Sequence, residues 1–310
     1  MLSGYENLNF DGYKLRNVHF SWTPENMPIG KIEPDTEISL KIPDASTNQI
    51  KYGMRTEDLA NIDASQLDGA LGPIEVVGAK KGSVIEVDIL EIKTGSWGWS
   101  AIIDDLGILK GRFRQRLVFW DIVDGVCHPV NFLEGIQIPL EPMLGVIGVS
   151  PSRGEFGMIP PQVFGGNMDS RINHSGTRVY LPVLRTGGML SFADPHASQG
   201  DGEVCGTGIE TSAEVLCRID LVDNMKIKSP SMIGQRKERG QCFVATGIGA
   251  NLYEASKDAT LSVIDFIASK GFSEEEAYIL ASVSMDLVIS EIVDEPNFVV
   301  SAYMPLKVFH

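Results

Sequence analysis

Single apolar and polar residues alternate along many short segments of this chain, as far as about residue 249. Ile38, Leu40 and Ile42 alternate with Ser39 and Lys41, so an extended backbone places the apolar residues on one face. Glycine and proline, 32 and 16 of the 310 residues, interrupt the chain more often than long helices tolerate. The pattern predicts many short strands and a mainly β body, folded as a sandwich or barrel.

Further runs rich in β-forming residues show where other strands are expected. They cover residues 84–92, 145–149, 178–184, 189–193, 213–222 and 243–248. Thr186, Gly187 and Gly188 lie between two of these runs, and glycine adopts positive φ without steric cost. We therefore expect a hairpin connection at this point.

The last sixty residues show helical spacing instead. Apolar residues recur at helical intervals over residues 256–270, and Gly271 follows as a stop signal. Ser273 and Glu276 then form a capping-box pattern. The apolar residues that continue this second helix are Ala277, Leu280, Val283 and Leu287. With a strand-like run over residues 298–303, the pattern predicts a β-rich body over residues 1–220 and an α+β portion over residues 221–310.

The charge balance restricts the classes of partner. The chain has 26 basic and 41 acidic residues, a formal net charge of −15, which disfavours nucleic acids and anionic membrane surfaces. Its apolar runs fall well short of the roughly 18 residues that suggest a membrane span, and residues 1–12 lack the pattern of a secretory signal. The cysteines are scattered and form no Cys-x-x-Cys motif; they are Cys127, Cys205, Cys217 and Cys242. We expect a cytoplasmic protein.

The acidic stretch over residues 193–210 is the strongest candidate for a functional site. Its four carboxylates are Asp194, Asp201, Glu203 and Glu210, and it contains no lysine or arginine. In an extended segment, Asp194 and His196 project from the same face, and Asp201 and Glu203 repeat that spacing. Carboxylates that converge with an imidazole suit a divalent metal ion. A hydrogen-bonded packing histidine beside a solvated acidic turn would fit the same residues.

Two other places offer candidate polar residues. Asn167 and Asp169 follow two glycines; an Asn side chain can recognise an amide, and an Asp can ligate a metal or orient a ligand. A plain turn would also account for them. His19 lies in an apolar context near Trp22, where a structural histidine is the usual outcome.

Four motifs, in order along the chain, resemble the acetamidase/formamidase family. They are Gly165-Gly166-Asn167-Met168-Asp169, Tyr180-Leu181-Pro182-Val183, Asp194-Pro195-His196-Ala197 and Gly200-Asp201-Gly202-Glu203-Val204-Cys205-Gly206-Thr207. Supporting similarity at residues 19–22, 72–76, 142–149 and 296–303 extends the resemblance over nearly the whole chain.

The resemblance implies a β-rich, metal-containing homo-oligomer, a dimer or tetramer, that hydrolyses short aliphatic amides to a carboxylic acid and ammonia. Combined with the residue pattern, it leads us to expect zinc or another divalent ion at Asp194 and His196, with Asp201 or His19 as further ligands. Glu203 is expected to take a proton from water and pass it to the departing nitrogen.

Asn167 and Asp169 would then position the small neutral amide. Two alternatives stay open. One is a metal-independent amidase with Cys205 as nucleophile, although neighbouring carboxylates disfavour a thiolate. The other is a non-catalytic β-sandwich binding protein whose acidic loop holds a structural calcium ion.

Overall fold

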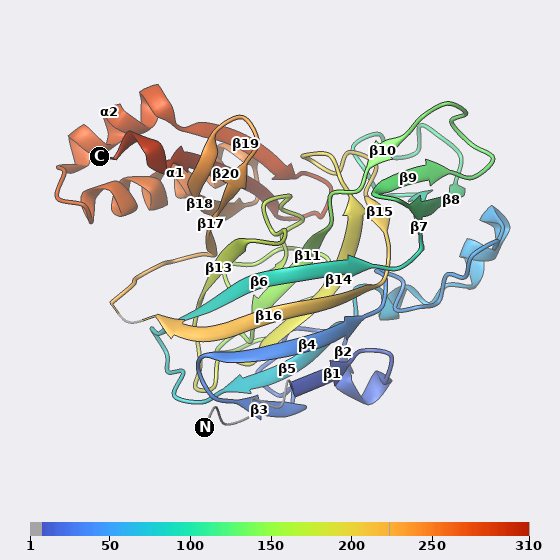
Figure 1. The fold of residues 1–310 in the computed structure, drawn as a ribbon, viewed down its shortest axis with the longest axis horizontal. Helices are drawn as coiled ribbons and strands as arrows, with labels where there is room; N and C mark the ends of the chain where they lie inside the picture. Colours follow the sequence, from blue (N-terminus) through green and yellow to red (C-terminus); the bar gives the residue numbers. More distant parts are fainter. Residues whose placement is uncertain (1–7, 223, 310) are drawn as a thin grey trace.

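Two large β-sheets and two C-terminal helices make up the structure, a computed structural model that describes residues 8–222 and 224–309 (Figure 1). The predicted mainly β body with a C-terminal helical portion is confirmed. Residues 1–7, on which the expectation of no secretory signal partly rests, lie outside the described residues. None of the helices in the described part is long and apolar enough to cross a membrane.

The first sheet has nine strands among the described residues. In spatial order they are β1 (Leu8–Asp11), β4 (Thr36–Ile42), β16 (Ala213–Val222), β6 (Val84–Thr94), β13 (Thr177–Pro182), β17 (Ser231–Arg236), β18 (Gly240–Gly249), β20 (Phe298–Pro305) and β19 (Asp286–Glu291). As the alternation predicts, Ile38, Leu40 and Ile42 of β4 are completely buried, whereas Lys41 is exposed.

The second sheet lies against the first and carries most of the candidate site residues. Its main path is β10 (Ile138–Pro139), β9 (Val126–Pro129), β8 (Arg116–Val123), β7 (Trp97–Ile102), β15 (Ile209–Glu210), β14 (Leu190–Ser198), β11 (Met143–Val149) and β12 (Gly165–Asn167). Beside β14 runs β5 (Ala70–Val76), which pairs with β2 (Val18–His19) and β3 (Gly30–Ile32).

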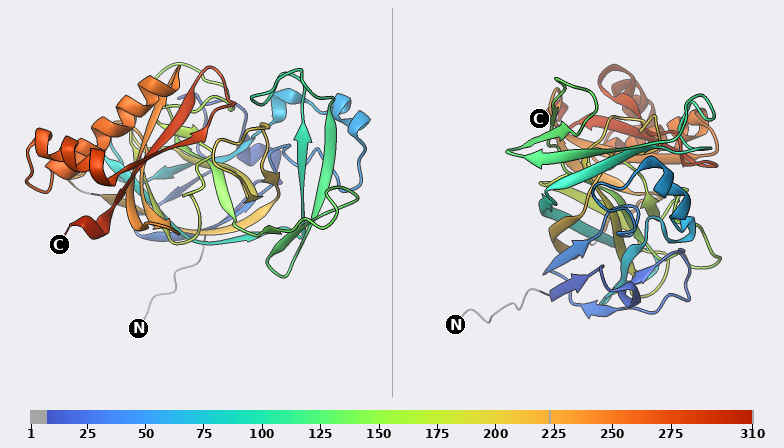
Figure 2. Two further views of the ribbon diagram at one scale, coloured as in Figure 1. Left: turned by 90° about the horizontal axis from the view of Figure 1, so that it is seen from above. Right: turned by 90° about the vertical axis from the view of Figure 1, so that its right-hand side faces the viewer.

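A single large apolar cluster fills the space between the two sheets. It contains Leu40 and Val87 from the first sheet and Ile147 and Phe192 from the second. Figure 1 shows β4, β6 and β16 as one layer crossing over β11 and β14, and Figure 2 shows the same layers from above and from the side. The body is therefore a β-sandwich, in which β11 and β14 are buried on both faces, whereas β4 and β16 are buried on one face only.

The two predicted helices are confirmed, with adjusted ends. Helix α1 spans Leu252–Ala268, and helix α2 spans Glu274–Ser284 with the expected capping box between Ser273 and Glu276. Leu287, expected in the second helix, belongs instead to β19, because Met285 has an extended backbone and ends α2. Both helices cover one face of β18 and β20. Four short 3₁₀ helices span Leu15–Asn17, Thr56–Asn61, Ala64–Gln66 and Leu306–Val308.

The structure bears on two expectations about how the elements are connected, a hairpin at Gly187 and Gly188 and a division of the chain at residue 220. The expected hairpin at Gly187 and Gly188 is wrong: both glycines have positive φ, but they carry the chain from β13 in one sheet to β14 in the other. The expected division at residue 220 stays a prediction. Hydrogen-bonded pairing of β13 with β17 runs across it, so the first sheet is continuous from the body into the C-terminal portion.

The contact between α1 and β18 depends on Gly247. A Cβ atom there would overlap the carbonyl oxygen of Ala255 and approach Ala259 in α1. We predict that Gly247→Ala lowers the free energy of unfolding by about 3 kcal/mol, because the helix must move off the sheet. Denaturant unfolding measures the change. Gly157→Ala is the control, since a Cβ there meets only an ordinary contact at 3.8 Å with Pro160; equal stability of the two variants would contradict the prediction.

Candidate active site

An acid-lined cavity of about 180 Å³ contains most of the predicted site residues. Six buried carboxyl side chains and one buried carboxamide line it; they are Asp68, Asn167, Asp169, Asp194, Glu203, Glu210 and Asp294. They come from β12, β14 and β15, from the loops that follow β12 and β14, and from the loops that precede β5 and follow β19. Among the described residues that line the cavity there is no lysine or arginine.

The centre of the site is His196, which is 1% exposed. Its Nε2 lies 3.0 Å from Oδ2 of Asp194 and 2.9 Å from Oε2 of Glu210. Asp194 and His196 share a face of β14, as their spacing predicts, and Glu210 lies opposite His196 on the paired strand β15. One nitrogen and two carboxylates therefore converge on one point.

Gln199 determines which ring nitrogen of His196 faces the carboxylates. Its Nε2 donates to the carbonyl oxygen of Asp169 at 2.8 Å, so its Oε1 is an acceptor, 2.7 Å from Nδ1 of His196. Nδ1 must then carry a hydrogen atom. In the neutral ring, Nε2 presents a lone pair to two carboxylates, an arrangement that requires either a further proton or a bound cation between them.

The pKa shifts of the three central groups also favour a proton or a cation between them. Burial opposes the charge on His196, but the carboxylates of Asp194 and Glu210 outweigh it and hold the pKa of the imidazole well above its usual value. Burial raises the pKa of Glu210 to about 8. Burial acts in the same way on Asp194, but the charge of His196, together with hydrogen bonds from neighbouring side chains, outweighs burial and lowers the pKa of this carboxyl.

Burial and neighbouring charges also disfavour the ionised form of the surrounding carboxyl groups. Burial, with repulsion from neighbouring carboxylates, raises the pKa well above its usual value for Asp68, Asp169, Glu203 and Asp294. Carboxyl groups crowded into a dry cavity cannot all ionise unless a cation joins them.

Several buried acceptor atoms lack a donor. Neither carboxylate oxygen of Asp169 accepts a hydrogen bond from the described residues, and the same is true of Oδ1 of Asn167. Nδ2 of Asn167 donates to Oδ2 of Asp294 at 2.8 Å, which fixes the orientation of the amide group. Buried acceptors of this kind are costly unless a ligand or ion completes them.

Two sets of side chains could hold a metal ion. Asp194, His196 and Glu210 form one, and Asp169, His196 and Glu203 form the other; the ligand atoms of each set lie within 4.8 Å of one another. Because both sets use His196, they describe one crowded centre. The residues present fit a divalent cation by donor chemistry, by burial and by the unpartnered oxygens of Asp169.

The backbone around these side chains is unusual. Asp68, Asp169, Asp194 and Glu203 adopt positive φ angles of 50°, 41°, 55° and 44°. Such conformations cost free energy for residues other than glycine and are enriched at functional sites. Gly145 of β11 leaves the necessary space, since a Cβ atom there would overlap carboxylate oxygens of Asp169 and Asp194.

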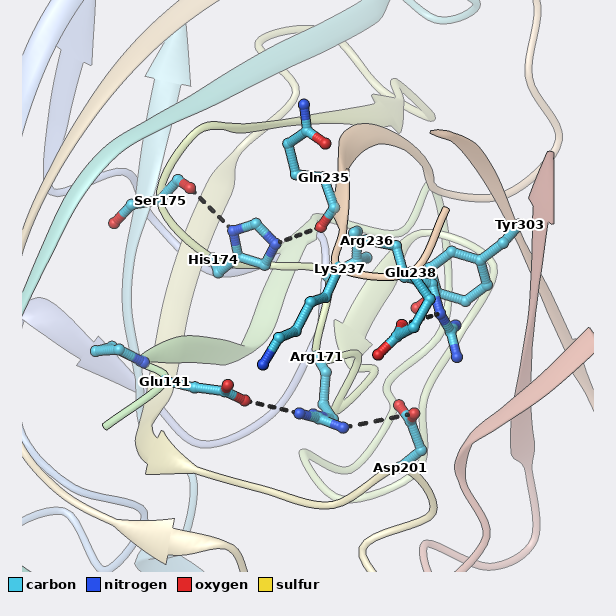
Figure 3. A pocket seen from close by; sticks show the side chains of 12 residues that line it. Glu141, Arg171, His174, Ser175, Asp201, Gln235, Arg236, Lys237, Glu238 and Tyr303 are labelled. Atoms are coloured by element: carbon cyan, nitrogen blue, oxygen red, sulfur yellow. Dashed lines mark hydrogen bonds and ion pairs between the residues drawn. The ribbon is translucent and has the colours of Figure 1, made fainter. Parts of the chain in front are cut away.

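Asp201 and His19, expected as further ligands, are not in either set. Asp201 faces solvent and lies 3.7 Å from Arg171, which also binds Glu141 at 2.8 Å, at the wall of a separate cavity (Figure 3). The segment from Asp201 to Glu203 is a turn and not a strand, so the two side chains diverge.

His19 already has two hydrogen-bond partners. Its Nδ1 donates to the carbonyl oxygen of Ser21 at 2.9 Å, and its Nε2 accepts from the hydroxyl of Ser191 at 2.8 Å. The ring packs edge-on against Trp22, and burial lowers its pKa to about 4. These contacts fit a structural histidine, which the apolar context of His19 in the sequence also favours.

Sequence reasoning assigned no role to Asp68, Glu210, Asp294 or Gln199. Glu210 belongs to the acidic stretch, and its position sixteen residues after Asp194 gave no sign that β15 pairs with β14. Asp68 and Asp294 come from remote parts of the chain, and only the packing of the two sheets brings them to the cavity.

We predict that Gln199→Leu lowers the affinity for zinc by about 10- to 100-fold, because the ring of His196 loses the partner that fixes its tautomer and orientation. Isothermal titration calorimetry with the metal-free protein measures the affinity. Gln49→Leu is a matched control: the carboxamide of Gln49 also makes two hydrogen bonds, both of them with backbone atoms of Asp63. Unchanged zinc affinity in Gln199→Leu would contradict the assignment.

The raised pKa values also predict how pH affects the stability of the metal-free protein. Folded Glu210 keeps its proton up to a pKa of about 8, and Glu291 up to about 7 because of burial, whereas an ordinary glutamate loses it near 4.5. The folded state therefore binds more protons over this range, and the free energy of unfolding should fall as the pH rises from about 4.5 to about 8. Denaturant unfolding after chelation measures it, and Glu210→Gln should flatten the slope. A stability that rises over this range would contradict the expectation.

Comparison with known proteins gives the same family along the whole chain. The model of the acetamidase/formamidase family matches residues 11–157 and 155–310. The formamidase of Methylophilus methylotrophus is 26% identical over 364 aligned positions, covering 94% of this chain and 89% of that protein.

Solved structures agree in fold over nearly their full length. The acetamidase from Bacillus halodurans is 28% identical with a TM-score of 0.89, covering 97% of this chain and 98% of that one. A predicted acetamidase/formamidase from Thermoanaerobacter tengcongensis is also 28% identical, with a TM-score of 0.88 and coverage of 97% and 96%. The chain therefore belongs to the acetamidase/formamidase family.

Proposed function

We propose that this protein hydrolyses short aliphatic amides, of the formamide and acetamide type, to a carboxylate and ammonia in the acid-lined cavity. The observation that carries the proposal is the convergence of Asp194, His196 and Glu210 beside the unpartnered acceptors of Asn167 and Asp169. The similarity to a formamidase and an acetamidase supports the reaction class.

Asp194, His196 and Glu210 would hold a divalent cation, for which we propose zinc. Zinc commonly combines imidazole with carboxylate ligands, whereas calcium takes oxygen ligands alone, so the donor set favours zinc over a structural calcium ion. When bound, such a cation lowers the pKa of a water molecule towards about 7 and polarises a carbonyl group.

Glu203 is the proposed proton carrier. It is buried, lines the cavity, and belongs to the set whose ligand atoms lie within 4.8 Å of those of Asp169 and His196. Burial raises its pKa well above the usual value, so its carboxylate is a better base than an ordinary glutamate. It can accept a proton from water and donate it to the amide nitrogen, which must be protonated to leave as ammonia.

Asn167 and Asp169 are the proposed groups that orient the amide. Because Nδ2 of Asn167 is bound to Asp294, its Oδ1 is the atom left to accept a hydrogen bond from the amide NH₂ group. Asp169 offers two further acceptors in the same cavity. Both residues therefore favour an uncharged substrate that brings its own N–H donors.

The thiol of Cys205 is a weaker candidate for the chemistry. Its Sγ donates to the carbonyl oxygen of Ala101 at 3.2 Å, and Cys205 is not among the described residues that line the cavity. A metal-independent mechanism through Cys205 thus lacks the access to the amide that a nucleophile needs.

We also propose a cytoplasmic homo-oligomer, a dimer or tetramer. The four cysteines are free, which supports a reducing compartment. Exposed apolar side chains on α2 and on the edge strand β19, such as Ile279, Val283 and Leu287, support association. Light scattering of the purified protein would report its mass in solution.

The test of the proposed function is ammonia release from formamide, acetamide and propionamide. We expect chelation to abolish release and zinc to restore it, and we expect Glu203→Gln to lower kcat by about 10²- to 10⁴-fold while zinc stays bound. Cys205→Ala should keep the wild-type rate. Full activity in a demonstrably metal-free preparation would overturn the metal-activated mechanism, and loss of activity in Cys205→Ala alone would favour the thiol.

A further inference from the structure

The cavity that holds the acids has a second, apolar part. Large apolar side chains line it in addition to the carboxylates; six of them are Ile50, Leu59, Ile62, Leu67, Trp99 and Leu106. They come from residues 50–67, around the two 3₁₀ helices before β5, and from β7 and the loop that follows it. The acids and these apolar side chains line the same cavity, so a molecule held at the acids can also contact the apolar side chains.

The size of the cavity exceeds what formamide or acetamide needs. Its volume of about 180 Å³ is larger than the roughly 150 Å³ of an apolar protein cavity known to hold a benzene molecule, which has six heavy atoms. Acetamide has only four heavy atoms. Even with a cation and a water molecule at the acidic end, each taking on the order of 30 Å³ or less, space remains for several carbon atoms beyond the carbonyl group.

The chemistry of the wall specifies what can fill this space. Leu59, Ile62, Leu67 and Leu106 are only half-buried, so part of their apolar surface faces the cavity. Covering such surface with another apolar group is favourable, by an amount proportional to the area removed from water. No lysine or arginine among the described lining residues could pair with an anionic group at this end. The fitting occupant is an uncharged hydrocarbon group, such as an alkyl chain.

We infer that this enzyme prefers primary amides with acyl chains of about four or five carbons, such as butanamide and pentanamide, over formamide and acetamide. The inference rests on the proposed amide hydrolysis at the acidic end. The carboxamide occupies the acids, and the acyl chain lies against Ile62, Leu59 and Trp99.

The zinc-loaded enzyme tests this with a series from formamide to hexanamide, measured as kcat/KM for ammonia release. We expect kcat/KM to rise about fourfold per methylene from acetamide to butanamide, the ratio that corresponds to about 0.8 kcal/mol per buried methylene group. A maximum at formamide or acetamide, with a decline as the chain lengthens, would overturn the inference and leave the proposed function intact. If no amide in the series releases ammonia, the proposed function itself fails.

A substitution in the apolar lining of the cavity tests where the acyl chain of the substrate lies. Ile62→Trp narrows the apolar part and should lower the ratio of kcat/KM for butanamide to that for formamide at least tenfold. Ile136→Trp, at an exposed position outside the cavity, should leave the ratio unchanged. An unchanged ratio in a folded Ile62→Trp protein would overturn the placement. The substrate series with the wild-type enzyme decides the preference even where this variant does not fold.

Discussion

A single electrostatic constraint dominates this structure: six buried carboxyl groups line one cavity beside the imidazole of His196, and the described lining residues include no lysine or arginine. Carboxylates at this density repel one another strongly where water is scarce. Burial, together with that repulsion, raises the pKa values of Glu210 and Asp169, so these groups hold protons that ordinary carboxyl groups would release. A divalent cation neutralises more of the negative charge than a single proton does. We therefore interpret the acids as a cation site and not as a solvated surface.

The fold has to hold these groups together against their repulsion. β14 lies centrally in the second sheet and supplies Asp194 and His196, while β11 on one side provides the space at Gly145 and β15 on the other provides Glu210. The loop that carries Glu203 is attached to the first sheet, because the N–H of Gly202 donates to the carbonyl oxygen of Ser290 at 2.9 Å. The site therefore depends on both sheets, and the apolar cluster between them keeps its carboxylates in place.

How much of this arrangement the sequence predicts depends on how far apart in the chain the interacting residues lie. Period-two alternation in β4, the capping box of α2 and the shared face of Asp194 and His196 are local, and all three are confirmed. Asp68 and Asp294 could not be found in this way. They reach the cavity through the packing of elements more than 200 residues apart, and no local pattern records which loops meet.

The placement of Asp201 shows a different limit. Its spacing from Glu203 matches that of Asp194 from His196, but a shared face follows only if the backbone is extended, and here the chain turns. Glu203, with a φ of 44°, points into the cavity, and Asp201 points towards Arg171 and solvent. Spacing is informative only after the local conformation is known.

The division of the cavity into two parts separates the reaction from the choice of substrate. The apolar wall comes largely from residues 50–67 and from the loop after β7, whereas five of the six acids come from other segments; the sixth, Asp68, directly follows Leu67 of the wall. Changes in the wall away from Leu67 alter the room for an acyl chain, and the five other carboxylates are supplied by segments that such changes do not touch. An amide hydrolase built this way can change which amides it accepts without rebuilding the site that cleaves them, because a hydrophobic wall discriminates by volume and the acids act on the carboxamide common to all of them.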